Sequence, residues 1–316
     1  MNGQVVRIHA SLADDMNAAV NGFMNYCRAK NLSPNTISYY RYRLQAFERF
    51  CADSPVAPEN VTPERIREFL TAEAEEKSAT TANHAYLTLQ AFFNFLVSDG
   101  FIAENPMQRV DRVKRRRTVI ETFTQEQVER ILSSCGKDFV GVRDRAMILV
   151  MVDCGLRVSE LCGLTMDDIS WTEQTLLVVG KGDIERVVPF GQAARQALTQ
   201  FMARRGALDT KTVFVSTLGQ PLNRHRARDI IKARCKEAGV TGVRCSPHTF
   251  RHTCAVWYLR NGGDVFSLQK LLGHSDLTMT RRYCELSQTD VADKHRLYSP
   301  ADKLTNKNTS GRKRLK

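Results

Sequence analysis

A basic run near the middle of the chain constrains the fold most, because it divides the sequence into two parts. Pro106 precedes it, and the run then reads Arg109, Arg112 and Lys114 to Arg117. Such a composition is typical of a linker, and 316 residues suffice for two domains with separate cores. We therefore predict an N-terminal helical domain over 11–100, a basic linker over 101–118, a second domain over 119–298 and a basic, disordered tail over 299–316.

The charge of the chain favours a polyanionic partner. The formal net charge is +12 and the sequence pI is about 9.4, so nucleic acid is the first candidate. The linker cations can lie along a phosphate backbone, although a solvated charge run is the alternative. The expected DNA-binding residues are Arg41, Arg43, Lys114, Arg115, Arg116 and Arg117.

Cysteine usage and hydropathy exclude several classes of protein. The nine cysteines form no C-x-x-C pair, so we expect reduced thiols and no disulfide framework or zinc site. Residues 1–14 hold no secretion signal, and no stretch approaches about 18 uninterrupted apolar residues. A cytoplasmic protein without a membrane segment is expected.

The N-terminal part shows helical periodicity throughout. Four helices are expected, beginning near Ser11, Pro34, Pro63 and Ser78, with Ser33 and Thr62 as N-caps. In the second helix Arg41, Arg43 and Arg49 fall on the face opposite the apolar stripe. They and the neighbouring tyrosines can track DNA, or the aromatic stripe is simply buried with solvated arginines opposite.

The second part opens with helices that carry strong start and stop signals. Thr124 and Gln127 match a capping box, and the apolar run Val140–Cys154 predicts a buried helix that ends at Gly155. We expect Arg157 in the following turn and Ser159 as the cap of the next helix.

The helical period changes to a β pattern within the second part of the chain. Thr175–Val179 and Ile184–Val188 predict a β-hairpin with Lys181 at its tip, and Val213–Val215 predicts a further short strand. The predicted fold class is therefore mainly α with a small antiparallel β-hairpin or sheet (α+β).

The last helices bring together residues suited to phosphoryl transfer. His248 and Arg251 are three residues apart on a helix that begins near Pro247, so they share a face. A shorter helix stops at Gly273, just before His274, and Tyr283 lies about two turns into the next helix. Arginine can clamp phosphate oxygens, histidine moves protons, and a tyrosine hydroxyl can attack phosphorus.

These segments together resemble the tyrosine recombinase family (phage integrase or Xer-like site-specific recombinases). The likeness spans about residues 11–290, where the N-terminal helices resemble the core-binding domain, SAM-like in fold. It is carried by five motifs in the family's order: Cys154-Gly-Leu-Arg-Val-Ser-Glu-Leu161, Gly180-Lys-Gly182, His248-Thr-Phe-Arg-His-Thr253, Leu271-Leu-Gly-His274 and Tyr283.

The resemblance implies a role for each of these residues. Tyr283 would attack the scissile phosphate and form a 3′-phosphotyrosine, while Arg157 and Arg251 hold the non-bridging oxygens. His274 would add a hydrogen bond there, and Lys181 would protonate the departing 5′-oxygen. The resemblance further implies that His248 acts as acid or base for the tyrosine hydroxyl and that Glu160 orients Arg157 or His248.

The same resemblance implies that no metal or nucleotide cofactor is needed. The expected partner is double-stranded DNA, bound by a homo-tetramer or with a related recombinase subunit, for integration, excision or resolution. Residues 286–297 would pack on a neighbouring protomer. A type IB topoisomerase, a telomere resolvase and a DNA-binding regulator that has lost catalysis are the alternatives.

Single residues also allow simpler interpretations. Arg157 can pair with Glu160 across a turn, Lys181 can be an ordinary hairpin residue, and either motif histidine can cap a helix. Tyr258 and Tyr298 compete with Tyr283 as nucleophile, but neither lies nine residues after His274. His252 has no position in the motif, and we expect it to be structural.

Overall fold

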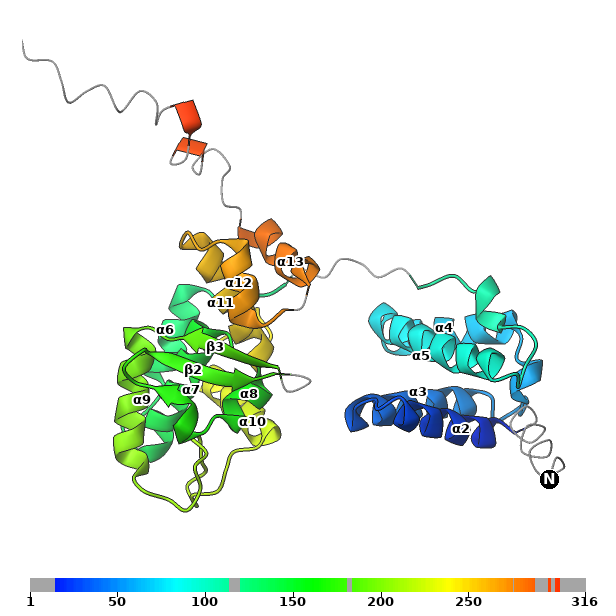
Figure 1. The fold of residues 1–316 in the computed structure, drawn as a ribbon, viewed down its shortest axis with the longest axis horizontal. Helices are drawn as coiled ribbons and strands as arrows, with labels where there is room; N and C mark the ends of the chain where they lie inside the picture. Colours follow the sequence, from blue (N-terminus) through cyan, green and yellow to red (C-terminus); the bar gives the residue numbers. More distant parts are fainter. Residues whose placement is uncertain are drawn as a thin grey trace, which may run out of the picture. The chain divides into compact units, whose positions relative to one another are not determined.

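The computed structural model describes residues 15–113, 120–180, 184–274, 276–287, 295–296 and 299–301, with backbone only at 285–287. The chain divides into two compact units, residues 1–118 and 119–316. Both are built mainly of helices, and the second also holds a three-stranded antiparallel sheet (Figure 1). The predicted fold class is therefore confirmed. Within the described residues, no helix has both the length and the apolar character needed to cross a membrane.

In its described residues the N-terminal unit contains the four expected helices and two short 3-10 turns, but the first helix begins at Met16 rather than near Ser11, because Asp15 is its N-cap. Each helix begins where a side chain accepts a hydrogen bond from the backbone of its first turn, from Asp15, Ser33, Thr62 or Ser78. The elements are α2 (Met16–Ala29), α3 (Pro34–Phe50), η1 (Pro58–Asn60), α4 (Pro63–Glu76), α5 (Ala79–Ser98) and η2 (Pro106–Arg109).

Aromatic side chains fill the core of this unit. Phe23, Phe47, Phe92 and Phe93 are almost fully buried, and Phe23 meets Phe92 edge to face at 5.7 Å between ring centroids. Such pairs stabilise a core by about 0.5–1.5 kcal/mol beyond the area they bury. The helical unit thus has a hydrophobic core of its own.

One arginine of this unit lies elsewhere than expected. Arg43 was predicted on the solvent face of α3, but its side chain is only 13% exposed. It donates to Glu73 on α4 at 3.3 Å, and Lys77 pairs with the same carboxylate. The prediction of an exposed Arg43 is wrong, because a buried glutamate on the neighbouring helix draws the guanidinium inward.

In its described residues, the C-terminal unit arranges the helices α6 to α13 and the sheet around one large core. α7 lies at its centre, covered by α9 on one side and α11 on another. In chain order the elements are α6 (Gln125–Ser133), α7 (Phe139–Cys154), α8 (Val158–Gly163), η3 (Met166–Asp168), β1 (Ile169–Ser170), β2 (Thr175–Val179), β3 (Glu185–Pro189), α9 (Gln192–Arg205), α10 (Arg224–Glu237), α11 (Pro247–Arg260), α12 (Val265–Leu272) and α13 (Leu277–Ser287).

The sheet has the order β1-β2-β3, and all its pairs are antiparallel. Leu176 and Val178 of β2 and Val188 of β3 face the core, as alternation along a half-buried strand requires. β1 was not predicted, because two residues are too few for a recognisable alternation. The strand predicted at Val213–Val215 is wrong: Val215 forms only an isolated bridge to Pro221, and the preceding Thr212 forms one to Thr165.

The turn after α7 corrects another prediction. Gly155 adopts φ 60°, and a Cβ there would lie 2.7 Å from Leu272, so the turn requires glycine. The next helix, α8, begins after Arg157, and Ser159 lies inside it rather than capping it. The Glu160 carboxylate accepts from the Arg157 backbone N–H at 2.7 Å, and this bond replaces the expected serine cap.

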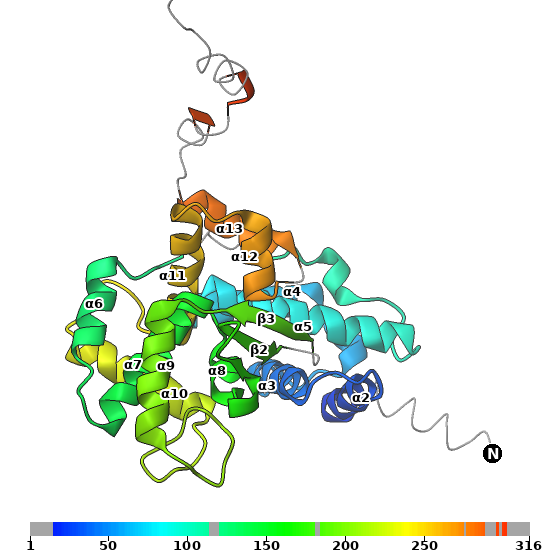
Figure 2. The ribbon, with the colours of Figure 1, turned by 60° about the vertical axis from the view of Figure 1, so that its left-hand side comes forward.

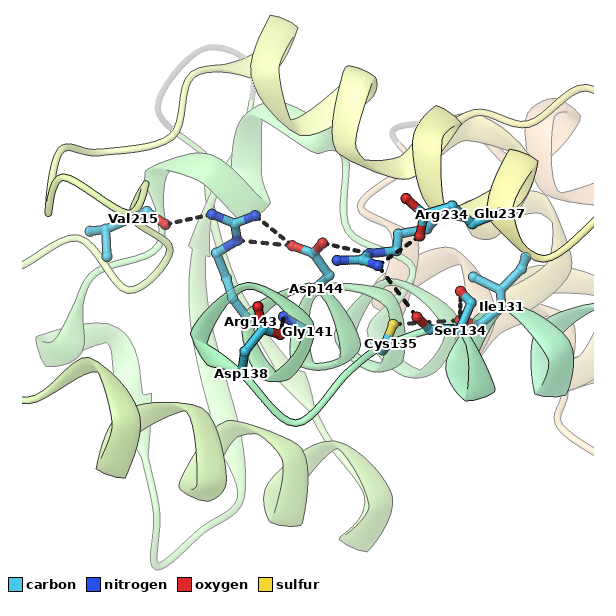
Figure 3. A network of polar contacts seen from close by, with 10 residues as sticks. All are labelled: Ile131, Ser134, Cys135, Asp138, Gly141, Arg143, Asp144, Val215, Arg234 and Glu237. Atoms are coloured by element: carbon cyan, nitrogen blue, oxygen red, sulfur yellow. Dashed lines mark hydrogen bonds and ion pairs between the residues drawn. The ribbon is translucent and has the colours of Figure 1, made fainter.

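A buried ion network joins α7 to α10 (Figure 3). We call Arg143, Asp144, Arg234 and Glu237 the Asp144 cluster. Asp144 accepts from Arg143 at 2.7 and 2.9 Å and from Arg234 at 2.7 Å, while Arg234 also donates to Glu237. Arg143 further donates to the carbonyl of Val215, so the network also ties α7 to the segment that precedes α10.

Candidate active site

Three arginines from different elements converge on the C-terminal end of α12. Arg186 of β3 donates to the carbonyl of Leu271 at 3.0 Å, and Arg251 of α11 donates to that of Leu272 at 2.6 Å. Arg157 donates to the Gly273 carbonyl at 3.4 Å. The last carbonyls of a helix lack intrahelical partners and carry partial negative charge, so they can hold guanidinium groups close together.

A single carboxylate joins two of these arginines. Glu160 accepts from Arg157 at 2.8 Å and from both terminal nitrogens of Arg186 at 2.9 Å. Burial acts to raise the pKa of Glu160, but the hydrogen bonds from Arg186 and Arg157 outweigh it, and the pKa lies below its ordinary value. Glu160 is therefore ionised at neutral pH. We call Glu160, Arg157, Arg186 and Arg251 the Glu160 cluster.

Arg251 is the most buried arginine of this cluster. It is 5% exposed, and its second terminal nitrogen donates to the Gly155 carbonyl at 2.6 Å. Burial first, and then the charge of Arg157, lowers the pKa of Arg251 to about 10. It is still charged at neutral pH, and nearby positive charge destabilises it, so an anion placed beside it would bind favourably.

Tyr283 lies beside the Glu160 cluster on α13, and α11, α12 and α13 lie together in both views (Figures 1 and 2). It is 3% exposed, and burial raises the pKa of its hydroxyl. The charges of Arg251, Arg282 and Arg157 act in the opposite direction. The hydroxyl is therefore protonated at neutral pH, in surroundings whose cations would favour the phenolate.

Two histidines contact this tyrosine. The ring of His274 stacks on it, with centroids 6.3 Å apart and planes at 13°, and His274 Nδ1 lies 3.0 Å from the Thr280 hydroxyl. His252 Nδ1 lies 2.8 Å from the Tyr283 hydroxyl oxygen. Burial and then the charge of Arg251 lower the pKa of His274 to about 4, so its ring is neutral at pH 7.

His248 stands at the exposed start of α11, two residues after the N-cap Ser246. Its pKa lies below its ordinary value, first because of partial burial and then because of the charges of Arg251, Arg228 and Arg244. These cations and the Glu160 cluster surround the histidine with positive charge. The arrangement suits an anionic group such as a phosphodiester.

Comparison with known protein families covers both units. Residues 121–290, more than half of the chain, match the phage integrase family, and residues 20–100 match the N-terminal SAM-like domain of phage integrases. The chain belongs to the phage integrase family of tyrosine recombinases. It is a site-specific recombinase that acts on DNA, an enzyme that transfers DNA strands, as the resemblance seen in the sequence implied.

Relatives match the recombinase over most of its length. Tyrosine recombinase XerC of Thermodesulfovibrio yellowstonii is 35% identical over 275 residues, which cover 84% of this chain and 90% of that protein. Tyrosine recombinase XerD of Proteus mirabilis is 35% identical over 278 residues, covering 86% and 89%. The fold is similar to that of a lambda integrase tetramer bound to a Holliday junction, with a TM-score of 0.73, 21% identity and coverage of 88% and 82%.

The structure brings six of the seven residues predicted to be catalytic into one region of the recombinase. They are Arg157, Glu160, His248, Arg251, His274 and Tyr283. The seventh, Lys181, lies outside the described residues, as does the competing Tyr298. The other competitor, Tyr258, donates to Ser267 at 2.9 Å.

Glu160 was expected to orient either Arg157 or His248, and its contacts favour Arg157. Its carboxylate touches Arg157, as a simple turn pair would, and also Arg186, which fixes it from a distant strand. His248 is not among its hydrogen-bond or ion-pair partners in the described part of the chain. The Arg157–Glu160 pair therefore fits both interpretations of the sequence, the simple ion pair across a turn and the contact that orients Arg157 in the family motif.

Sequence reasoning missed Arg186, although a signal was present. On β3 it is paired with the buried Val178, and Val188 two residues on faces the core. An arginine at an inward position of a strand needs a partner, and Glu160 is that partner. His252 was noticed but taken as structural, since only the packing of α11 on α13 shows that it touches Tyr283.

The DNA-binding residues predicted in the N-terminal part are only partly described. Arg41 is half-buried and donates to Asn21 at 3.2 Å. Arg43 pairs with Glu73, and its guanidinium also lies over the rings of Tyr39 and Tyr42 at 5.5 and 5.7 Å. Residues 114–117 lie outside the described ranges. A DNA-binding role for all six cations stays a prediction.

No metal site is evident in the part of the chain that the structure describes. There, groups of three or more histidine, cysteine, aspartate or glutamate side chains do not come together as ligands.

Proposed function

We propose that this recombinase cleaves DNA with Tyr283 as nucleophile and forms a 3′-phosphotyrosine. The observation that carries the proposal is the position of Tyr283, whose hydroxyl lies 2.8 Å from the residue that follows Arg251 and on whose ring His274 stacks. A tyrosine hydroxyl in cationic surroundings is suited to attack a phosphodiester that guanidinium groups bind.

Arg157 and Arg251 would hold the non-bridging oxygens, where negative charge grows in the transition state. Both guanidinium groups are oriented in advance, Arg251 by two carbonyls and Arg157 by Glu160. Preorganised donors of this kind need no reorganisation when the reaction occurs. Held by the carbonyls at the end of α12 and by Glu160, the arginines would therefore stabilise the transition state without a metal ion.

The remaining residues supply hydrogen bonds and protons. His274, stacked on Tyr283, would donate to a phosphate oxygen. Lys181 would protonate the departing 5′-oxygen, because an ammonium group is a suitable acid for a leaving alkoxide. His248, at the exposed start of α11, would exchange the proton of the tyrosine hydroxyl with the surroundings of the site.

Because the phosphotyrosine retains the energy of the phosphodiester, strand exchange would need no ATP. The partner would be double-stranded DNA in the cytoplasm, and the helical unit, the basic linker and the catalytic unit would all take part in binding it. Recombination between two duplexes requires four cleavages, so we propose a tetramer, of this chain alone or with a related subunit, that carries out integration, excision or resolution.

Trapping of covalent DNA tests this proposal. Purified protein is incubated with nicked genomic fragments, and sequencing of the trapped DNA yields a nicked substrate that carries the site. Tyr283→Phe should form no covalent complex while binding this substrate nearly as tightly as the wild type. Tyr258→Phe, which removes a hydroxyl outside the site, is the matched control and should form the complex normally. A covalent complex with the Tyr283→Phe protein would refute the nucleophile assignment.

A further inference from the structure

The hydroxyl of Tyr283 has a specific partner that the family motif does not assign. His252 follows Arg251 on α11, and its Nδ1 lies 2.8 Å from the Tyr283 oxygen on α13. The two rings are tilted by 48°, with centroids 5.6 Å apart. The imidazole therefore meets the hydroxyl with a ring nitrogen, in hydrogen-bond geometry, rather than stacking on the phenol as His274 does.

His252 also lies one turn after His248 on the same helix. The charged and titratable groups that face it are His248 and Arg251 on its own helix, Arg282 and Tyr283 on α13, and His274 after α12. His248 acts on His252 through its charge, whereas the group in hydrogen-bond contact with Tyr283 is His252. A proton that leaves the phenol reaches His252 before any other imidazole.

We propose that His252 is a catalytic residue that accepts the Tyr283 proton during cleavage and returns it during ligation. This inference rests on the proposed function, because it requires Tyr283 to be the nucleophile. In cleavage the phenolic O–H bond breaks as the bond from oxygen to phosphorus forms, and the proton moves to Nδ1. The 5′-oxygen leaves with a proton from the general acid. Ligation reverses both transfers.

The protonation states at neutral pH agree with this role. Burial first, and then the charges of His248, Arg251 and Arg282, lower the pKa of His252 to about 4, so the ring is neutral and has a free lone pair. Tyr283 keeps its proton, because burial raises its pKa. A phosphate bound by the arginines adds negative charge near His252 and raises its pKa. DNA binding would thus increase the basicity of His252 when it is needed.

Two substitutions separate proton transfer from simple positioning. His252→Asn can keep a hydrogen bond to the hydroxyl but cannot accept its proton, and His252→Ala can do neither. Single-turnover cleavage of the nicked substrate is measured across pH 5–9 with saturating protein. We expect both variants to cleave at least about 100-fold more slowly than the wild type at pH 7, in keeping with the loss of a general base.

The pH profile and chemical rescue give readouts that positioning alone would not change. The wild-type rate should fall on this account only at low pH, where His252 becomes protonated; its pKa is about 4 without DNA, and a bound phosphate moves the fall to higher pH. The His252→Ala rate should instead rise about tenfold per pH unit, because hydroxide must then remove the phenolic proton, and added imidazole should restore part of it. DNA binding and thermal unfolding should stay close to those of the wild type.

Each other outcome overturns the inference. If His252→Asn cleaves as fast as the wild type while His252→Ala is slow, the residue only positions Tyr283. If both variants cleave normally, it has no part in the step. Covalent capture by the wild type separates these failures from failure of the proposed function. A wild type that never becomes linked through Tyr283 refutes the nucleophile, and with it the proton acceptor.

Discussion

The Asp144 cluster and the Glu160 cluster are both built from a buried carboxylate and arginines, but we assign them different roles. In each, one carboxylate that is 2% exposed lies between two arginines and joins elements far apart in the chain. Asp144 links α7 to α10, and Glu160 links the start of α8 to β3. The ion pairs alone do not tell which cluster is the site.

The two clusters differ in their charge balance. In the Asp144 cluster two arginines face Asp144 and Glu237, so the charges cancel. In the Glu160 cluster three arginines face one glutamate, which leaves two positive charges near the end of α12. The side chain of Arg157 is also 36% exposed. A neutral network around a buried carboxylate stabilises a frame, whereas residual positive charge at an accessible edge is free to bind an anion.

The largest effect on folding should come from Asp144→Ala. This change leaves Arg143 and Arg234 buried without their shared carboxylate, which typically costs about 3–5 kcal/mol. Chemical denaturation should show this loss, while cleavage by the folded fraction stays near normal. The control is Asp167→Ala, which removes an exposed carboxylate paired with Lys211 and should change the free energy of unfolding by less than about 1 kcal/mol. Equal effects of the two changes would contradict a structural role for the Asp144 cluster.

Arg157→Ala should slow DNA cleavage strongly and leave the stability of the fold almost unchanged, the opposite of Asp144→Ala. Glu160 keeps its two bonds from Arg186, so the fold should be little affected. Cleavage should fall by about 100- to 1,000-fold, the usual loss on removing one transition-state donor. Arg204→Ala, on an exposed part of α9, removes the same charge and serves as control. If both variants cleave DNA equally well, the residual charge of the Glu160 cluster has no catalytic role.

Gly273→Ala should have the smallest effect on stability and cleavage, and the Glu160 cluster should be the only one of the two clusters that it disturbs. Gly273 adopts φ 63°, and an added Cβ would lie 2.9 Å from the Arg186 side chain. Left-handed backbone costs a residue other than glycine about 1–2 kcal/mol, so a loss of this size is expected in thermal unfolding, together with slower cleavage. Gly163→Ala, where a Cβ meets nothing within 4 Å, should be nearly neutral. Equal stability of the two variants would show that the turn tolerates a side chain.

Local rules predicted the helices well and the contacts between them poorly. The capping box of Thr124 and Gln127 is confirmed, as are the caps Ser33 and Thr62. Ser159 failed as a cap because the Arg157 turn is fixed by Glu160, which Arg186 holds from 26 residues further along the chain. Arg43 failed as an exposed residue for a similar reason, since Glu73 lies on another helix.

The sequence by itself determined the elements of this recombinase and the residues of its family motif, because capping, periodicity and glycine turns act over a few neighbouring residues. Only the tertiary structure decided which side chains meet. Arg186 reaches Glu160 and the end of α12, and His252 reaches Tyr283, through the packing of β3, α11, α12 and α13. Such contacts depend on the relative placement of whole elements, which burial of the shared core fixes and no local pattern encodes.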